Sequence, residues 1–203
     1  MDGPTIQHAS ETALRNGATP ISILHELRSV DVGIPLAVMC YYNTVHHAGH
    51  ERFANSLREA GVCAAIVPDL PLEESGLWCA AADTSGVETV MLAAPTAPDE
   101  RLPRVAERAR GFVYSVGLLG VTGERAELAL TATVLAARVK KITNKPVLIG
   151  VGVSNAIQAV EASRVADGVI MGASVVHRMI DGGSEAVGLF VAEVRNALDG
   201  ATW

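Results

Sequence analysis

Short apolar runs alternate with amphipathic stretches along the whole chain. The runs are rich in Val, Ile, Leu and Ala, and they cover residues 35–42, 63–71, 87–95, 111–116, 145–154 and 167–175. Runs of this length, bounded by turn or charge signals, predict strands that are buried on both faces. The remaining segments have apolar residues at helical spacing, which predicts helices at 5–17, 22–30, 50–60, 73–84, 99–109, 128–142, 155–164 and 184–198.

Residues that favour helix ends support these boundaries. Ser154 stands where an N-cap is expected, and Pro103 falls early in its predicted helix, where proline costs least. Four glycines stand where C-caps are expected: Gly17, Gly61, Gly86 and Gly111.

The alternation of strands and helices predicts right-handed parallel βαβ units. Two architectures use such units, an open doubly wound sheet and a (β/α)8 barrel. The glycine-rich turns lie in the last two units of this chain, and a barrel commonly builds its phosphate site from the loops after its last two strands. We therefore predict an α/β fold of the (β/α)8 TIM barrel family, a single domain over residues 1–203 with six of the eight parallel strands visible.

Composition narrows the classes of protein that fit. The 203 residues are 49% hydrophobic and carry a net charge of −6, which argues against binding to a nucleic acid backbone. No apolar run approaches the ~18 residues of a membrane span, and no signal peptide pattern opens the chain. Three scattered cysteines, Cys40, Cys63 and Cys79, predict reduced thiols. We expect a cytoplasmic protein that binds neither nucleic acid nor membrane.

Glycines at two successive strand ends are the first candidates for chemistry. IGVGVS places Gly150 and Gly152 at the end of one predicted strand, and IMGAS places Gly172 and Ala173 at the end of the next. Backbone N–H groups at such ends can converge on one dianion, and small residues let a phosphate approach closely. Tight βα turns alone would also need glycine, but the repetition, with a further GVTG at 120–123, favours a phosphate site.

The stretch YSVGLLGVTG (114–123) is the second candidate. Tyr114 ends an apolar run and precedes a glycine-spaced loop of the kind that a mobile lid requires. Thr122 and Gly123 are placed to close over a substrate in such a lid. The residues alone fit a core tyrosine and a flexible connection equally well.

Two other polar features have simpler interpretations. Asp69, between two prolines in VPDLPLEES, is expected to cap the helix that begins near Glu73. His46 and His50 have the i, i+4 spacing of a metal pair, but neither a thiol nor a second pair converges on them. We therefore predict solvated histidines and no metal site.

Four motifs together resemble the alpha subunit of tryptophan synthase. DGPTIQ (2–7), VPDLPLEES (67–75), GVTG (120–123) and GVGVSN (150–155) match that family's motifs in order and at comparable spacing, and the resemblance covers essentially the whole chain. The family is a (β/α)8 barrel that cleaves indole-3-glycerol phosphate into indole and glyceraldehyde 3-phosphate. The resemblance therefore implies a carbon–carbon lyase of tryptophan biosynthesis.

The resemblance also implies roles for single residues. Asp2 matches a catalytic aspartate that stabilises positive charge at the indole N–H, and Tyr114 matches a tyrosine beside the reacting carbons. Thr122 matches a lid threonine that bonds this aspartate. Tyr41 and Asn43 are similar to positions that face the substrate and the partner subunit. The positions matched to the substrate phosphate are Gly123, Gly150, Gly152, Gly172 and Ala173.

The chain also departs from the family pattern. The family often has serine at the positions of Met171 and Ala173, and commonly a basic residue at Leu118. In the family, DGPTIQ follows the second strand, and the upstream region carries a glutamate that acts as general acid and base. We expect this chain to lack that N-terminal βαβ portion and to release negligible indole. We also expect it to aggregate, to dimerise through its exposed strand edges or to fold poorly.

The resemblance implies a partner as well. The family passes indole to a β subunit that holds pyridoxal phosphate, in an α2β2 complex, and the α subunit itself needs no cofactor. Two alternatives stay open, a noncatalytic partner that modulates the β subunit and another phosphosugar-binding barrel. Phosphoribosylanthranilate isomerase and indole-glycerol-phosphate synthase are such barrels. The latter needs a lysine at the carboxyl end of a strand, where none of Lys140, Lys141 and Lys145 is predicted, and DGPTIQ speaks against both.

Overall fold

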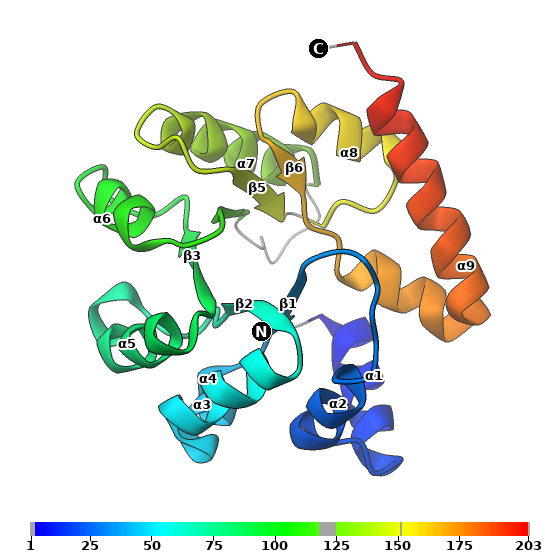
Figure 1. Ribbon diagram of the computed structural model, residues 1–203. Coiled ribbons are helices and arrows are strands. Elements are labelled where there is room, and N and C mark those ends of the chain that lie inside the picture. The colour runs from blue at the N-terminus through cyan, green and yellow to red at the C-terminus, as the bar shows by residue number, and fades with distance from the viewer. Residues whose placement is uncertain (1–2, 118–124, 151, 203) are drawn as a thin grey trace.

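The strands of this protein form one parallel sheet. The computed structural model describes residues 3–117, 125–150 and 152–202. Spatial order follows chain order in the sheet, and the strands curl into an open half-barrel surrounded by helices (Figure 1). The strands are β1 (Leu36–Met39), β2 (Val62–Ile66), β3 (Glu88–Ala93), β4 (Val113–Val116), β5 (Val147–Gly150) and β6 (Gly168–Val169).

A helix follows each strand, and two more precede β1. The helices are α1 (Pro4–Arg15), α2 (Pro20–Leu27), α3 (Tyr42–Ala48), α4 (His50–Glu59), α5 (Gly76–Ser85), α6 (Arg101–Arg108), α7 (Arg125–Lys140), α8 (Ala156–Ser163) and α9 (Ala173–Asp199), with a 3-10 turn η1 (Leu72–Glu74). Helix α1 contacts α9, so the first and last helices lie side by side (Figure 1). The prediction of parallel βα units in a TIM-barrel type of fold is confirmed.

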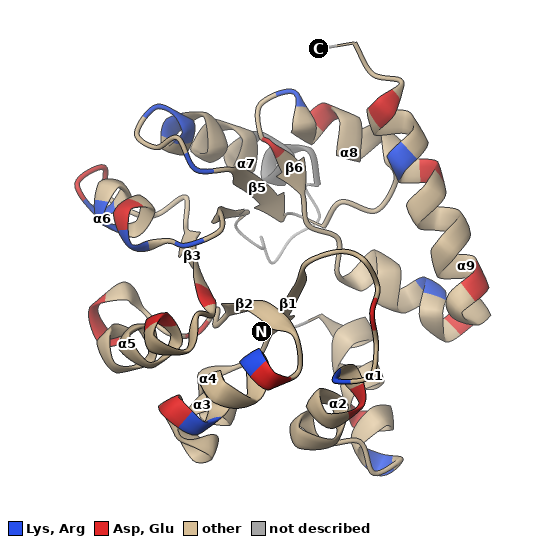
Figure 2. Ribbon diagram, viewed as in Figure 1, with Lys and Arg blue, Asp and Glu red and all other residues tan. Residues whose placement is uncertain are grey.

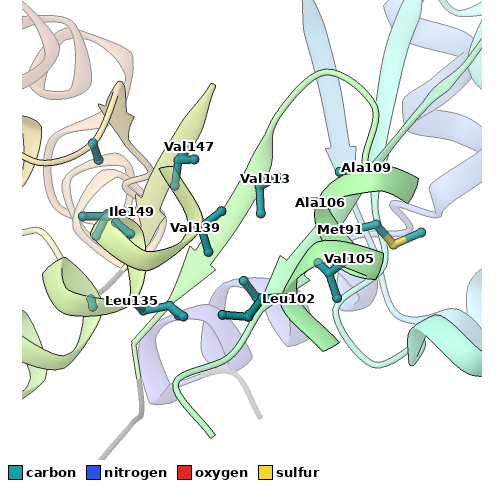
Figure 3. Packing of buried hydrophobic residues seen from close by; sticks show 14 of the residues in the cluster. Met91, Leu102, Val105, Ala106, Ala109, Val113, Leu135, Val139, Val147 and Ile149 are labelled. Atoms are coloured by element: carbon teal, nitrogen blue, oxygen red, sulfur yellow. The ribbon is translucent and has the colours of Figure 1, made fainter. Parts of the chain in front are cut away.

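Most of the core lies between the sheet and its helices. Side chains that alternate along the strands point outward from β4 and β5 and meet the apolar faces of α6 and α7 (Figure 3). This cluster includes Leu102, Val105, Val113, Leu135, Val139, Val147 and Ile149. Burying each such Val, Leu or Ile contributes about 1.5–3 kcal/mol. A second cluster joins β2 to α4 and α5.

The inner face of the sheet carries a smaller apolar cluster. Ala64, Ile66 and Val90 are buried there, with Phe112 and Tyr114 packed against them. The first strand is less covered on this face, where the side chain of Met39 is 49% exposed. Because the residues on both faces of the strands are apolar, the strands read as continuous apolar runs in the sequence.

The strand predicted at 167–175 ends earlier than expected, so this boundary is wrong. Strand β6 contains only Gly168 and Val169, and α9 begins at Ala173, earlier than the predicted helix at 184–198. β-Branched residues in the first turns of α9 made this segment resemble a strand. The helix is interrupted at Gly183, whose φ of 66° and ψ of −159° are not helical.

Two local predictions also need correction. No helix is predicted between the strand at 35–42 and the helix at 50–60, but this interval forms α3, which is anchored by the fully buried Val45. The N-cap of α8 is Asn155, whose side chain accepts the N–H of Gln158, rather than Ser154. The four predicted C-cap glycines do have positive φ: Gly17, Gly61, Gly86 and Gly111.

No helix within the described ranges is long and apolar enough to cross a membrane.

Candidate functional site

Tyr114 and Gly150 lie together on adjacent strands. The register pairs Tyr114 of β4 with Leu148 of β5, two residues before Gly150. The Tyr114 side chain leans toward the carboxyl end of the sheet, because a Cβ built on Gly150 would lie 2.1 Å from the Tyr114 hydroxyl oxygen. Only glycine at position 150 leaves room for this ring. Burial raises the pKa of the Tyr114 phenol, so the hydroxyl stays protonated at neutral pH.

The two glycine-rich strand ends are joined by a side chain. The Ser174 Oγ donates a hydrogen bond of 3.0 Å to the Val153 carbonyl oxygen, which links the first turn of α9 to the β5–α8 loop. Gly152 in that loop has a φ of 60°, and Gly172 is the N-cap residue of α9. The structure therefore brings Gly152, Gly172 and Ala173 to the same end of the sheet as Gly150.

The N-terminus of α9 has the chemistry of an anion site. Ala173 and Ser174 occupy the first two helical positions, whose N–H groups have no acceptor within a helix. Gly172 and Ala173 are exposed to solvent. Free N–H groups and the helix dipole favour a negative group at this position.

The loop after β1 is fixed by Asp69. The Asp69 Oδ1 accepts the N–H of Tyr42 at 2.8 Å, so the carboxylate holds the first turn of α3. The prediction that Asp69 caps the helix near Glu73 is wrong, because η1 follows Pro71 and has no side-chain cap. Tyr41 is the N-cap residue of α3 and is 41% exposed.

Asp69 also affects a neighbouring thiol. Burial, and secondly the negative charge of Asp69, raise the pKa of Cys40 to about 11. This thiol is therefore protonated and unreactive at neutral pH.

Three candidate residues lie outside the described part of the chain. They are Asp2, Thr122 and Gly123, so their expected roles stay predictions. Leu118 lies outside it too. Met171 is described, and it packs against the apolar cluster that contains Val153 and Phe190.

His46 and His47 lie on α3, and His50 is the first residue of α4. His46 and His47 are exposed, and His50 Nε2 lies 2.9 Å from the Tyr42 hydroxyl oxygen. Within the described residues, no group of three or more His, Cys, Asp or Glu side chains is arranged to hold a metal ion.

Two open hollows lie away from the candidate residues. One of about 690 Å³ follows β6 and the second half of α9, and one of about 760 Å³ lies among α3, α4 and α5. Neither is lined by Tyr114, Gly150, Gly152 or Gly172. The candidate residues at the carboxyl ends of the strands therefore lie outside both hollows.

Sequence reasoning missed Ser174 and Arg178. Ser174 follows Gly172-Ala173 directly, and a serine in the first turn after a glycine-rich strand end was the available signal. Arg178 Nη1 donates to the Ser174 carbonyl oxygen at 3.2 Å. Ser174 was hidden because it fell at the end of the strand predicted at 167–175, and Arg178 because it fell between that strand and the helix predicted at 184–198.

Comparison with known proteins decides the family. The profile of the family described as "Tryptophan synthase alpha chain" matches residues 1–196. The chain belongs to the tryptophan synthase alpha chain family. The alpha chain of Streptomyces coelicolor is 44% identical over 191 residues, which are 93% of this chain and 70% of that protein.

Solved structures of tryptophan synthases share the fold. A tryptophan synthase structure from Mycobacterium tuberculosis matches with a TM-score of 0.88 and 36% identity, over 98% of this chain and 76% of that one. A chain of the tryptophan synthase complex from Pyrococcus furiosus matches with a TM-score of 0.84 and 32% identity, over 98% and 81%.

Membership in the tryptophan synthase alpha chain family confirms the resemblance inferred from the four motifs. It also confirms the TIM-barrel class and a role in tryptophan biosynthesis. The relatives are named tryptophan synthase alpha chain, which is a lyase, and the Pyrococcus furiosus structure is described as a tryptophan synthase complex.

Proposed function

We propose that this chain binds indole-3-glycerol phosphate and takes part in its cleavage to indole and glyceraldehyde 3-phosphate. The observation that carries the proposal is the arrangement of Tyr114 across Gly150, beside the loop that Ser174 ties to the start of α9. In a chain of this family, that arrangement puts a polar ring and a set of free N–H groups at one end of the sheet.

The reaction needs two proton movements and one bond cleavage. A proton is delivered to indole C3, and the ring nitrogen then carries positive charge. A second proton leaves the hydroxyl on the adjacent carbon as that carbon becomes a carbonyl. The bond between C3 and that carbon breaks, and its electron pair returns to the indole ring. The products together contain the atoms of the substrate, with no change of oxidation state.

The residues divide between the two halves of the substrate. In the proposal, N–H groups around Gly150, Gly152, Gly172 and Ala173 hold the phosphate. Tyr114, whose raised pKa keeps its hydroxyl protonated, lies beside the reacting carbons.

Three residues outside the described part of the chain complete the proposed site. Asp2 faces the indole nitrogen and stabilises the transient cation, and Thr122 and Gly123 close over the substrate.

The general acid and base is not assigned to a residue of this chain. The resemblance places that role on a glutamate upstream of DGPTIQ. A positioned acid–base group typically contributes ~10²–10⁴ in rate, so we expect these 203 residues to bind the substrate but to release negligible indole.

The proposal includes the family's partner. We expect the chain to bind a tryptophan synthase β subunit, which holds pyridoxal phosphate, in an α2β2 arrangement. We expect the chain itself to need no cofactor, since proton transfer and positioned dipoles suffice for its reaction.

Calorimetric titration of the purified chain with indole-3-glycerol phosphate tests this function, with indole measured in the same samples. We expect one saturable site per chain, lost when indole glycerol without phosphate replaces the substrate. Absence of saturable binding would contradict the proposal. A chain that binds no substrate but raises the activity of an added β subunit would instead support the role of noncatalytic partner.

A further inference from the structure

Helix α9 consists of two pieces that one arginine joins. The pieces meet at Gly183, where the backbone leaves the helical region. Arg178 in the first piece places its guanidinium carbon 3.5 Å from the ring centroid of Phe190 in the second. The same guanidinium donates from Nη1 to the Ser174 carbonyl oxygen at 3.2 Å. The first turn of α9 is therefore tied to the second piece across the break.

The same turn is tied to the β5–α8 loop through Ser174. The Ser174 Oγ donates to the Val153 carbonyl oxygen, and Val153 is 6% exposed. Val153 and the 3% exposed Phe190 belong to one apolar cluster, together with Ala156 and Ala159 of α8. Ser174 and Arg178 thus connect the first turn of α9 to a single packed unit from two directions.

We propose that Ser174 and Arg178 are positioning residues that hold the first turn of α9 against the β5–α8 loop, so that N–H groups of both segments converge on the substrate phosphate. This inference rests on the proposed function, which places the phosphate there. Neither side chain needs to touch the ligand. Two segments that approach one anion must be held within about 0.5 Å of their binding geometry, and side chains that lock them together provide this constraint.

The chain carries its hydroxyl at the second helical position of α9 and not at the first. Ala173, at the first helical position, has no hydroxyl to offer a ligand, and the next residue, Ser174, directs its hydroxyl to a backbone carbonyl. The hydroxyl therefore stabilises the arrangement of backbone donors instead of serving as a donor to the ligand.

The test measures the affinity of the full 203-residue chain for glycerol 3-phosphate by calorimetry. We expect Ser174→Ala to weaken binding about 2- to 10-fold, the range of one lost hydrogen bond, and Ser174→Thr, which keeps a hydroxyl, to restore most of it. Ser184→Ala makes the same chemical change at an exposed position of α9 and should bind as the wild type does.

Arg178 variants separate positioning from simple charge. Lysine keeps the positive charge but loses the planar group that both stacks on Phe190 and reaches the Ser174 carbonyl. We therefore expect Arg178→Lys and Arg178→Met to weaken binding to a similar degree. Normal affinity in Arg178→Lys with loss in Arg178→Met would show that Arg178 acts through its charge, and would overturn its positioning role.

The outcomes distinguish this inference from the proposed function. If Ser174→Ala binds glycerol 3-phosphate as tightly as the wild type does, the positioning role of Ser174 is overturned and the proposed function stays intact. A wild-type chain that does not bind glycerol 3-phosphate overturns the phosphate site and this inference with it. Should Ser174→Ala fail to fold, as thermal unfolding would show, the Arg178→Lys and Arg178→Met pair decides the question.

Discussion

At the scale of single residues, the candidate site depends on which side chains are absent as much as on which are present. The ring of Tyr114 occupies the space that a side chain at position 150 would need. The glycine spacing of IGVGVS was visible in the sequence, and it pointed to phosphate. The contact with Tyr114 was not visible, because it joins residues on two strands whose register only the folded sheet defines.

Gly150→Ala should displace the Tyr114 ring. A methyl group would overlap the phenol, and overpacking of this kind typically costs about 1–3 kcal/mol of the free energy of unfolding. Urea denaturation measures this cost. In a double-mutant cycle, Tyr114→Ala should remove most of it, because the residue that clashes is gone.

Gly188→Ala is the matched control for this substitution. Gly188 lies in α9, and a Cβ built on it has no heavy atom within 4 Å. We expect no loss of stability there, since alanine is favoured over glycine within a helix. If Gly150→Ala were as stable as the wild type, the described packing of Tyr114 would be incorrect.

Cys40 should be slow to alkylate. With a pKa of about 11, set first by burial and then by Asp69, only about 1% of this thiol is thiolate at pH 9. The rate of iodoacetamide labelling at Cys40, followed by peptide mass spectrometry, should keep rising well above pH 9.

Asp69→Asn removes the charge that raises the Cys40 pKa but not the burial. We expect the labelling profile to move to lower pH without reaching that of a free thiol. A wild-type profile with its midpoint near pH 9 would contradict the environment described for Cys40. The raised pKa also means that the contribution of this thiol to stability is complete below the unfolded pKa and is lost as the pH rises through the folded value.

At the scale of elements, non-local contacts decide where several segments begin and end. The parallel strands and most helices followed from apolar periodicity, since strand burial and amphipathic helices leave local patterns. Helix α3 did not, because the carboxylate that holds its first turn comes from Asp69, which lies 27 residues from Tyr42 in the sequence. The start of α9 was missed because Val175 and Val176 suit a strand as well as a helix.

Asp167 connects three elements and should make stability depend on acid. Its carboxylate accepts Nζ of Lys140 at 2.5 Å, at the end of α7, and the N–H of Val147 at 2.8 Å, at the start of β5. Burial acts to raise the pKa of Asp167, but the bond from Lys140, the Val147 N–H and the lysine charge outweigh it, so the pKa is lowered.

The lowered pKa of Asp167 determines whether its carboxylate stabilises the protein more at high or at low pH. The stabilisation is present above the unfolded pKa of about 3.9 and is lost as the pH falls through the folded value. Asp167→Asn should therefore be less stable than the wild type at pH 7, and the difference should shrink toward pH 3. Urea denaturation across this range measures it.

Asp199→Asn is the control for the acid effect. It removes an exposed carboxylate that pairs with Arg195 within one turn of α9, and such pairs contribute little. We expect a small difference from the wild type. A constant deficit of Asp167→Asn at all pH values would contradict the role given to the carboxylate charge.

At the scale of the whole molecule, the sheet is open and the charge is negative. In the part of the chain that the structure describes, β1 and β6 each pair with a strand on one side only. That these edges pair with other chains stays a prediction. Charged residues lie mainly on the surrounding helices and their loops (Figure 2).

The overall charge bears on how a phosphate is held. A chain with a net charge of −6 does not attract a dianion through its general field, so binding must come from local N–H groups and helix dipoles. In the function that we propose, the phosphate of indole-3-glycerol phosphate therefore binds between the β5–α8 loop and the start of α9.

Nuclear magnetic resonance of the labelled chain, titrated with indole-3-glycerol phosphate, tests this location most directly. We expect the amide signals of Gly152, Gly172 and Ala173 to shift together as the site saturates, while those of Val191 and Leu198, beside the hollow at β6, stay in place. Shifts confined to Val191 and Leu198, or to α3 and α4, would contradict it.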